Sequence, residues 1–161
     1  MSLQGTTAAT VRQVIIDALE GQTLTGMTYL TGIQLSQSCD PLSLTSPSAA
    51  AACVDGGFTV LPGAGRTVAA STPHSGSGTV QRIWEIPFIV RVSLDLNSIN
   101  LDKLSVDLLN VPAAIRRLID AELEPTVGTN YNVTSITEAA PSRTGSILIY
   151  EVTYVIKFPF A

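Results

Sequence analysis

The residues that could carry out chemistry in this chain are few and scattered. One histidine, His74, lies in the stretch STPHSGSG, with Ser75 and Ser77 beside it. A serine nucleophile needs a strand, a sharp turn and a helix around it, and this glycine- and serine-rich stretch does not have that pattern. We therefore interpret His74 as an exposed loop residue, and we expect the protein not to be an enzyme.

Metal and redox chemistry also lack a suitable pattern. Cys39 and Cys53 are too far apart for a C-x-x-C motif, and there is no second histidine to complete a zinc site of familiar spacing. In a reducing cytoplasm both thiols stay free, whereas a disulfide is the alternative for a particle that leaves the cell. We expect no metal ion and no cofactor.

Two other patterns are better explained by structure than by chemistry. The run GAGRT at residues 63–67 faintly resembles a phosphate-binding loop, but it lacks the lysine and the six-residue span, and no helical pattern follows it. We interpret Asp102, Asp107 and Asp120 as part of the solvated face of a helix, and nothing pairs two of them for acid/base catalysis. We expect these carboxylates to face the solvent.

The composition favours a protein that acts through its surface. Charged residues make up 14% of the 161 residues, against roughly 25% in an average soluble domain. Because charges keep monomers apart, so few of them indicate a surface that contacts another protein, and a neutral, loop-rich monomer is the alternative. The net charge is −4 and the only basic pair is Arg116-Arg117, so we expect no grip on nucleic acid.

The sequence predicts neither a secretory signal nor a membrane segment. Its first apolar stretch contains Arg12, Asp17 and Glu20, which the core of a signal peptide would not tolerate. No run of about 18 uncharged apolar residues is present, so no segment is expected to span a membrane. We expect the protein to be made and kept in a cytoplasm.

The start of the chain predicts a helix and then a strand. Apolar residues recur with helical spacing over residues 11–21, where Thr6 or Thr7 would cap the helix and Gly21 would end it. Residues 28–35 (TYLTGIQL) alternate between apolar and polar in the manner of a strand.

A long insertion follows at residues 36–79. It contains only three charged residues, is rich in serine, alanine, glycine and proline, and has one strand-like piece at residues 58–61. Loops of this length in a compact domain are either functional or disordered, and disordered segments are normally rich in charge. We expect the insertion to order against a neighbouring subunit, with a floppy loop as the alternative.

The second half predicts three strands. Residues 84–94 alternate strictly, and Pro87 within them indicates a sheet edge or a bulge nearby, because proline cannot donate to a ladder. Residues 131–138 and 147–158 form a predicted hairpin around a turn at 139–145. The last strand is about twice the usual length, so we expect its end to contact something outside the domain.

A helical pattern lies between these strands, at residues 101–124. Pro112 interrupts it, which predicts a kink or two helices, the second capped near Asn110, and Pro125 is expected to end it. The element order predicts a single α+β domain over residues 1–161, with an antiparallel or mixed sheet and helices packed on one face.

Three segments together resemble the tail terminator, or tail-completion, proteins of long-tailed bacteriophages. They are the opening VRQVIIDALEG helix, the unit WEIPFIVRVSL followed by LDKLSVDLL, and the closing YNVTSITEAAPSRTGSILIYEVTYVIKFPF hairpin. The ending VTYVIKF is the part most similar to the family. Residues 36–79 depart from it, because the family usually has a shorter segment there.

The resemblance implies a virion protein of the tail and neck that is assembled in the host cytoplasm. It would form a homohexameric ring on the last ring of the tail tube protein, stop tube polymerisation and present a surface to the head–tail connector, or neck, protein. DNA would pass through the ring without specific binding. Another neck, head-closure or minor tail protein is the nearest alternative, and a module that binds a small ligand between sheet and helices is an alternative of another class.

Candidate contacts with the next subunit or with the tube come from the insertion, the last turn and the C-terminal strand. Chain ends usually fray, so two phenylalanines next to one need a surface on which to dock. The candidates are Phe58, Arg66, Pro141, Arg143, Phe158 and Phe160.

Overall fold

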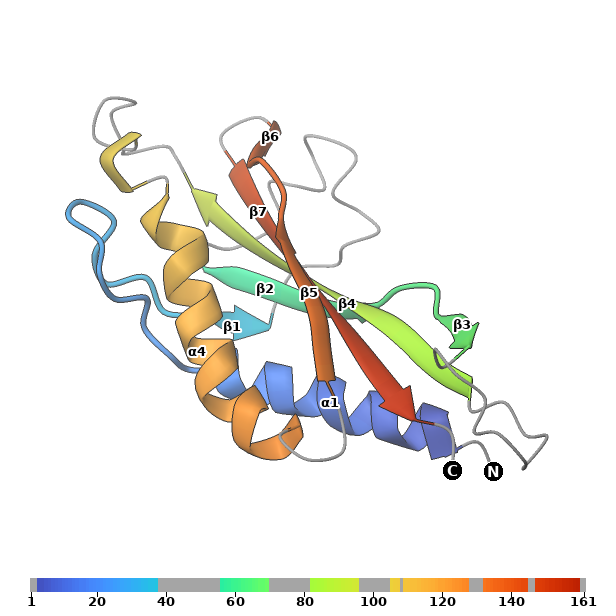
Figure 1. Ribbon diagram of the computed structural model, residues 1–161. Coiled ribbons are helices and arrows are strands. Elements are labelled where there is room, and N and C mark those ends of the chain that lie inside the picture. The colour runs from blue at the N-terminus through green and yellow to red at the C-terminus, as the bar shows by residue number, and fades with distance from the viewer. Residues whose placement is uncertain are drawn as a thin grey trace, which may run out of the picture.

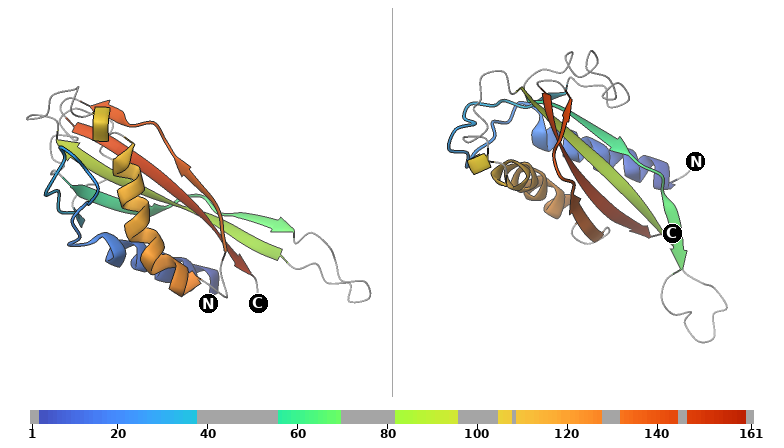
Figure 2. Two further views of the ribbon diagram at one scale, coloured as in Figure 1. Left: turned by 60° about the vertical axis from the view of Figure 1, so that its left-hand side comes forward. Right: turned by 90° about the horizontal axis from the view of Figure 1, so that it is seen from above.

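In the described part of the chain, seven strands form one mixed sheet, and the helices α1 and α4 pack on one of its faces (Figures 1 and 2). The α+β class expected from the sequence is confirmed. The computed structural model describes residues 3–37, 56–69, 82–95, 105–107, 109–127, 132–144 and 147–159.

The sheet has the strand order β1-β2-β4-β7-β5, with β3 paired to β4 and β6 paired to β7. Only β1 and β2 are parallel, and all other pairs are antiparallel. The elements are α1 Leu3–Leu19, β1 Ser36–Gln37, β2 Gly57–Pro62, β3 Arg66–Ala69, β4 Arg82–Asp95, α4 Asn110–Val127, β5 Asn132–Glu138, β6 Ser142–Thr144 and β7 Ile147–Pro159.

Helix α1 is longer than the sequence predicts. It begins at Leu3, so a cap at Thr6 or Thr7 is wrong. Its end is as expected, because Gly21 has a φ of 74°, the left-handed conformation that stops a helix and that glycine adopts without a steric penalty. The apolar stripe of the helix faces the sheet and is buried.

Strands β4 and β7 form the centre of the sheet and confirm the predicted alternation. They pair from Ile83 and Pro159 at one end to Asp95 and Ile147 at the other. The full length of β7 is therefore paired within the chain, and its length alone does not call for an outside contact. The buried residues on the helix-facing side are Ile86, Phe88, Val90, Val92 and Leu94 in β4, and Leu148, Tyr150, Val152, Tyr154, Ile156 and Phe158 in β7.

Pro87 of β4 lies opposite the gap between β2 and β3, where its missing N–H is tolerated, as the sequence predicts. Strand β2 pairs with β4 as far as Phe88, and β3 resumes the pairing at Glu85. Between the two strands, the N–H of Gly63 donates to the carbonyl oxygen of Pro87 at 2.7 Å. The N and C=O groups of one strand residue point to the same side of the strand, so the nitrogen of Pro87 also faces this gap. Because no strand lies opposite it there, its missing N–H removes no hydrogen bond from the sheet.

The predicted strand at residues 28–35 is wrong. Apart from a bridge between Thr23 and Gln34, this segment follows an irregular path. It is nevertheless part of the core, because Leu30, Ile33 and Leu35 are buried. The alternation in its sequence therefore reflects burial without strand pairing.

Helix α4 begins at Asn110, as the interruption near Pro112 predicts, with Pro112 in its first turn where a missing N–H is tolerated. It continues to Val127, so the prediction that Pro125 ends it is wrong by two residues. Residues 105–107 form a short helical turn before it, and residues 101–104 lie outside the described part.

The segment expected to be an insertion, residues 36–79, contributes β1, β2 and β3 to the sheet. Strand β2 lies between β1 and β4, and its Val60 is a core residue. The rest of this segment, including Cys39, Cys53 and His74, lies outside the described residues.

Candidate assembly surface

The helix-free face of the sheet carries two ion pairs between neighbouring strands, and a small buried cluster of Ile147 and Ile149 lies on the same face. Arg66 and Glu85 form an ion pair at 2.8 Å between β3 and β4, and Arg91 and Glu151 form another at 2.8 Å between β4 and β7. Each pair joins residues that lie directly opposite in the sheet. The Arg66 side chain is 74% exposed, so its ion pair contributes little to stability and leaves the guanidinium accessible.

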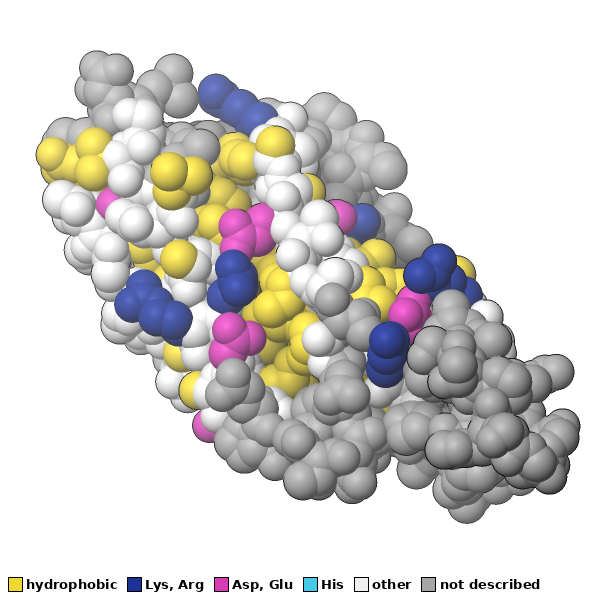
Figure 3. Space-filling view, in the orientation of Figure 1, with side chains coloured by type: hydrophobic (Ala, Val, Ile, Leu, Met, Phe, Trp, Pro, Cys, Tyr) yellow, Lys and Arg dark blue, Asp and Glu magenta, His cyan; other side chains and the backbone are white. Residues whose placement is uncertain are grey.

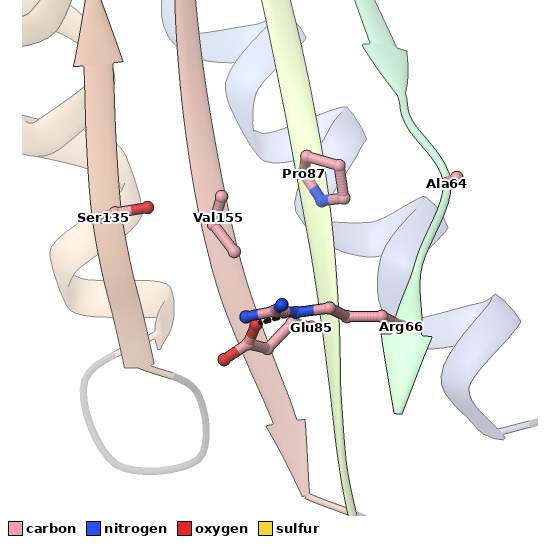
Figure 4. Close-up of a pocket in the computed structure, with 6 residues that line it drawn as sticks. All are labelled: Ala64, Arg66, Glu85, Pro87, Ser135 and Val155. Carbon is pink, nitrogen blue, oxygen red and sulfur yellow. Dashed lines mark hydrogen bonds and ion pairs between the residues drawn. The ribbon is translucent and has the colours of Figure 1, made fainter. Parts of the chain in front are cut away.

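A shallow hollow of about 350 Å³ opens on this face (Figure 4). It extends from β5 across β7 and β4 to the start of β3, and Glu85 and Arg66 close one end of it. One carboxylate held by one guanidinium does not make an acid/base pair, so the lining gives no basis for a reaction. The lining residues are Ala64, Arg66, Glu85, Pro87, Ser135 and Val155.

The GAGRT segment is explained by packing beside this hollow. A β-carbon placed on Gly65 would lie 2.5 Å from Nε1 of Trp84, so only glycine lets the chain pass over the indole. A strand, β3, follows the segment where a phosphate-binding loop would need a helix. The two glycines therefore serve the turn from β2 into β3.

Strand β3 and the first residues of β4, Arg82–Glu85, form a hairpin arm. In both views of Figure 2 the arm extends past the ends of α1 and α4, away from the body of the molecule. The outer edge of β3 pairs with no strand in the described part of the chain.

Strand β5 ends the sheet on the other side, and its outer edge also pairs with no described strand. Ala139 N donates to Glu151 O at 3.0 Å, so Ala139 directs its backbone toward β7. Because backbone groups alternate along a strand, Ile136 and Glu138 direct their N–H and C=O groups outward. Proteins often protect such an edge with proline, lysine or a bulge. Strand β5 (NVTSITE) has a bulge near its start but contains neither proline nor lysine.

The edge of β2, unlike those of β3 and β5, has hydrogen-bond partners within the described part of the chain. Strand β1 pairs with its first residues, Gly57 and Phe58. Beyond them, Arg12 of α1 donates from Nε to the carbonyl oxygen of Val60 at 2.9 Å. The side chain of Arg12 therefore occupies the position that an added strand would need.

Polar side chains fix α4 to β5 and β7. Arg116 forms an ion pair with Glu138 at 3.0 Å, and the Tyr154 hydroxyl donates to Asp120 at 3.2 Å. Burial, followed by the charge of Asp120, raises the pKa of Tyr154, so its hydroxyl stays protonated. Figure 3 shows hydrophobic side chains in the seam between α4 and β5, beside acidic and basic side chains. This seam leads directly to the open edge of β5.

Asp107 is the most buried charged group of the described residues, with no exposed surface. Its carboxylate accepts hydrogen bonds from the backbone N–H groups of Thr28, Tyr29 and Leu30 at 2.7, 2.7 and 2.8 Å. Burial raises the pKa of Asp107, but these three bonds and one from the Asn110 side chain lower it more, so the pKa lies below its ordinary value. The prediction of a solvated carboxylate is wrong here, because Asp107 replaces the missing strand partners of residues 28–30.

Tyr150 lies in the same corner of the core. Burial and the charge of Asp107 raise its pKa to about 12. Its hydroxyl is buried and has no hydrogen-bond partner among the described residues. Near this corner Tyr29, Val106 and Leu109 are exposed, Leu109 to 82%.

Two of the six predicted contact residues lie in the core. Phe58 and Phe158 are core residues, 0% and 1% exposed, and the Phe158 ring packs edge-on against Phe88 with centroids 6.3 Å apart. These two side chains therefore cannot contact a partner in this fold, because the alternation of β2 and β7 directs them toward the helices. Phe160 lies outside the described residues.

The other three candidates are at the surface, in two separate places. Arg66 lies on the arm. Arg143 is exposed on β6 and Pro141 is half-buried just before it, next to the start of β7. The structure does not bring these two places together.

Sequence reasoning missed Asp107 and the outer edge of β5. The partners of Asp107 lie 77 to 79 residues away in the chain, and no local pattern indicates them. For β5 there was a signal, because a strand without lysine or proline is a poor edge strand unless something pairs with it.

Comparison with models of protein families and with curated proteins gives no match for this chain. Among the described residues, no group of three or more His, Cys, Asp or Glu side chains is placed to hold a metal ion. Neither α1 nor α4 is long and apolar enough to cross a membrane.

Proposed function

We propose that this chain is a structural subunit of a bacteriophage particle. It assembles into a homohexameric ring that caps the tail tube, ends tube polymerisation and joins the tail to the head connector. Its place is the tail and neck of the virion, after assembly in the host cytoplasm. The protein is not an enzyme and uses no cofactor.

The observation that carries this proposal is that β3 and β5, on opposite sides of one sheet, each have an outer edge without a partner among the described strands. A closed ring needs two different complementary surfaces on each subunit, because its interfaces run head to tail. The outer edge of β5 and the outer edge of β3 are two such surfaces, and each offers backbone hydrogen-bonding groups over several residues. Three segments resemble tail terminator proteins, and this resemblance supports a location of the proposed ring on the tail tube.

The charge of the chain fits a ring around DNA. A net charge of −4 and the pairing of Arg66, Arg91 and Arg116 with carboxylates leave little attraction for phosphates. DNA therefore passes through the centre without being held.

The test is assembly of the purified protein, alone and with purified tail tubes. Light scattering after size exclusion, together with negative-stain imaging, should show six-subunit rings, either free or on the tube ends. Tubes grown with the protein present should stop lengthening. A protein that stays monomeric with tubes present contradicts the proposal.

Two other results would favour a different function. Rings that bind the connector but not the tube indicate a head-closure protein. A small molecule that stays bound in native mass spectrometry indicates a ligand-binding module. Hydrophobic side chains of the described core lie between the sheet and the helices, where such a ligand would bind.

A further inference from the structure

We infer that β5 of one subunit pairs antiparallel with β3 of the next, so that the sheets of neighbouring subunits join edge to edge. This inference rests on the proposed ring, because it names the two surfaces that close it. The partner at each edge is a second copy of this chain.

Strand direction makes the pairing antiparallel. Strand β3 is antiparallel to β4, β4 to β7 and β7 to β5, so β5 and β3 run in opposite directions on the two sides of the sheet, as Figure 4 shows. The rotation that carries one subunit of a ring to the next keeps the direction of each strand relative to the ring. The β5 of one subunit therefore meets the β3 of its neighbour in the antiparallel sense.

Backbone groups are available on both edges. On β5, Ile136 and Glu138 direct their N–H and C=O groups outward. On β4, the backbone groups of Pro87 point toward β2 and β3, and those of Glu85, two residues away, point the same way. Arg66 of β3 lies opposite Glu85, so the backbone groups of Arg66 point toward β4. The backbone groups of the next residue, Thr67, therefore point outward. Two antiparallel edges with outward groups at alternate residues form an ordinary ladder, which is strand addition between chains.

Access and charge support the same pairing. The arm that carries β3 extends past the helices, so a neighbour can reach it without moving them (Figure 2). The only charged residue of β3 is Arg66, and the only one of β5 is Glu138, whose side chain is 37% exposed. Both side chains are already in ion pairs within the chain, so joining the two edges brings no unpaired like charges together.

A symmetric pairing of two β5 edges is the main competitor. It would close as a dimer and leave both β3 edges unused, because an isologous contact consumes the same surface on both partners. It would also place two strands that each carry Glu138 side by side. The head-to-tail pairing uses both edges and closes only as a ring.

Disulfide trapping distinguishes these arrangements. The full chain carries Cys39→Ser and Cys53→Ser in every variant, so that only introduced cysteines react. Thr137→Cys is combined with Arg66→Cys, or with Val68→Cys two residues further along β3, to cover both possible registers. Thr137 and Arg66 are exposed and oppose Thr153 and Glu85 on the helix-free face. Thr67→Cys with Thr137→Cys is the matched control, because Thr67 opposes Trp84 on the other face.

Under mild oxidation, one of the two same-face variants should give a ladder of covalent species that ends at six subunits, and the Thr67→Cys control should give little. Thr137→Cys alone should give no covalent dimer. Rings that form without any β5–β3 crosslink, or a strong Thr137→Cys dimer, overturn this inference and leave the proposed ring in place. A chain that remains monomeric before oxidation, even with tail tubes present, overturns both.

Discussion

Backbone polar groups are satisfied within the chain at the corner around Asp107, whereas at the outer edge of β5 the described part of the chain does not satisfy them. At the corner, three N–H groups without a strand partner are satisfied by one buried carboxylate of the same chain. At the β5 edge, the outward groups of Ile136 and Glu138 have no strand partner in the described part of the chain. The first arrangement completes the fold, and under the proposed ring the second is completed by a neighbouring subunit.

This difference separates residues that maintain the fold from residues that serve assembly. Changes at the corner should lower the free energy of unfolding and leave the association of folded molecules unchanged. Changes at the β5 edge should do the reverse. The edge of β2 shows that the chain can close an edge with a single side chain, Arg12, so the open edge of β5 is not a general property of this sheet.

The largest effect on stability is expected for Asp107→Ala. It leaves the buried N–H of Leu30 and the half-buried N–H groups of Thr28 and Tyr29 without an acceptor, which should lower the free energy of unfolding by about 3 kcal/mol. Urea unfolding followed by circular dichroism measures the loss. Asp120→Ala, which removes a single hydrogen bond, is the control and should cost about 1 kcal/mol. Equal losses for the two variants would show that the corner has no special role.

The same contact should depend on pH. The pKa of Asp107 is lowered from 3.8 in the fold, so the ionised carboxylate contributes stability above that value, and this contribution is lost as the pH falls through the folded pKa. The difference in unfolding free energy between the natural protein and Asp107→Asn should therefore be constant near neutral pH and shrink below about pH 4. A difference that grows on acidification would contradict the account.

A smaller effect is expected at the two buried tyrosines, which form a matched pair. Tyr154→Phe removes the hydrogen bond to Asp120 and should cost about 1 kcal/mol. Tyr150→Phe removes a hydroxyl that has no partner and should leave the stability unchanged or raise it. Thermal unfolding of both variants at one protein concentration gives the comparison. A larger loss for Tyr150→Phe would mean that its hydroxyl is engaged after all.

A substitution on the edge of β5 should have a small effect on stability and a large effect on assembly. Thr137→Lys adds a charge to the exposed side of β5 and should change the free energy of unfolding by less than about 0.5 kcal/mol. It should nevertheless shift rings to monomers in light scattering, because lysine on an edge strand opposes strand addition. Gln13→Lys, on the exposed side of α1, is the control and should assemble normally. Rings that form equally well from both variants would remove β5 from the interface.

The parts of the fold that the sequence predicts are those with strong local periodicity. The alternation in β4 and β7 and the apolar stripe of α1 are set by burial against one core, so each leaves a regular pattern in its own segment. Residues 28–35 have a similar alternation but no strand partner, because their N–H groups bind Asp107 from a distant segment. A periodicity indicates burial, and only the tertiary contact decides between strand and loop.

The candidate surface was harder to predict for a related reason. Phe158 was a candidate because it lies next to the chain end, and Phe58 because it lies in the expected insertion, but both side chains belong to the buried face of the sheet. Arg66 is the candidate that lies on the arm, where its exposure leaves it accessible. The open edge of β5 is a property of sheet order, which no single segment encodes.

Hydrogen exchange at β5 tests the central claim most directly. In the assembled ring, the outward amides of Ile136 and Glu138 should exchange at least about tenfold more slowly than in the monomeric Thr137→Lys variant, a ratio that corresponds to about 1.4 kcal/mol. The amide of Ala139, already bonded to β7, should change much less. Rings in which Ile136 and Glu138 exchange as fast as in the monomer would show that the subunits do not join through this edge.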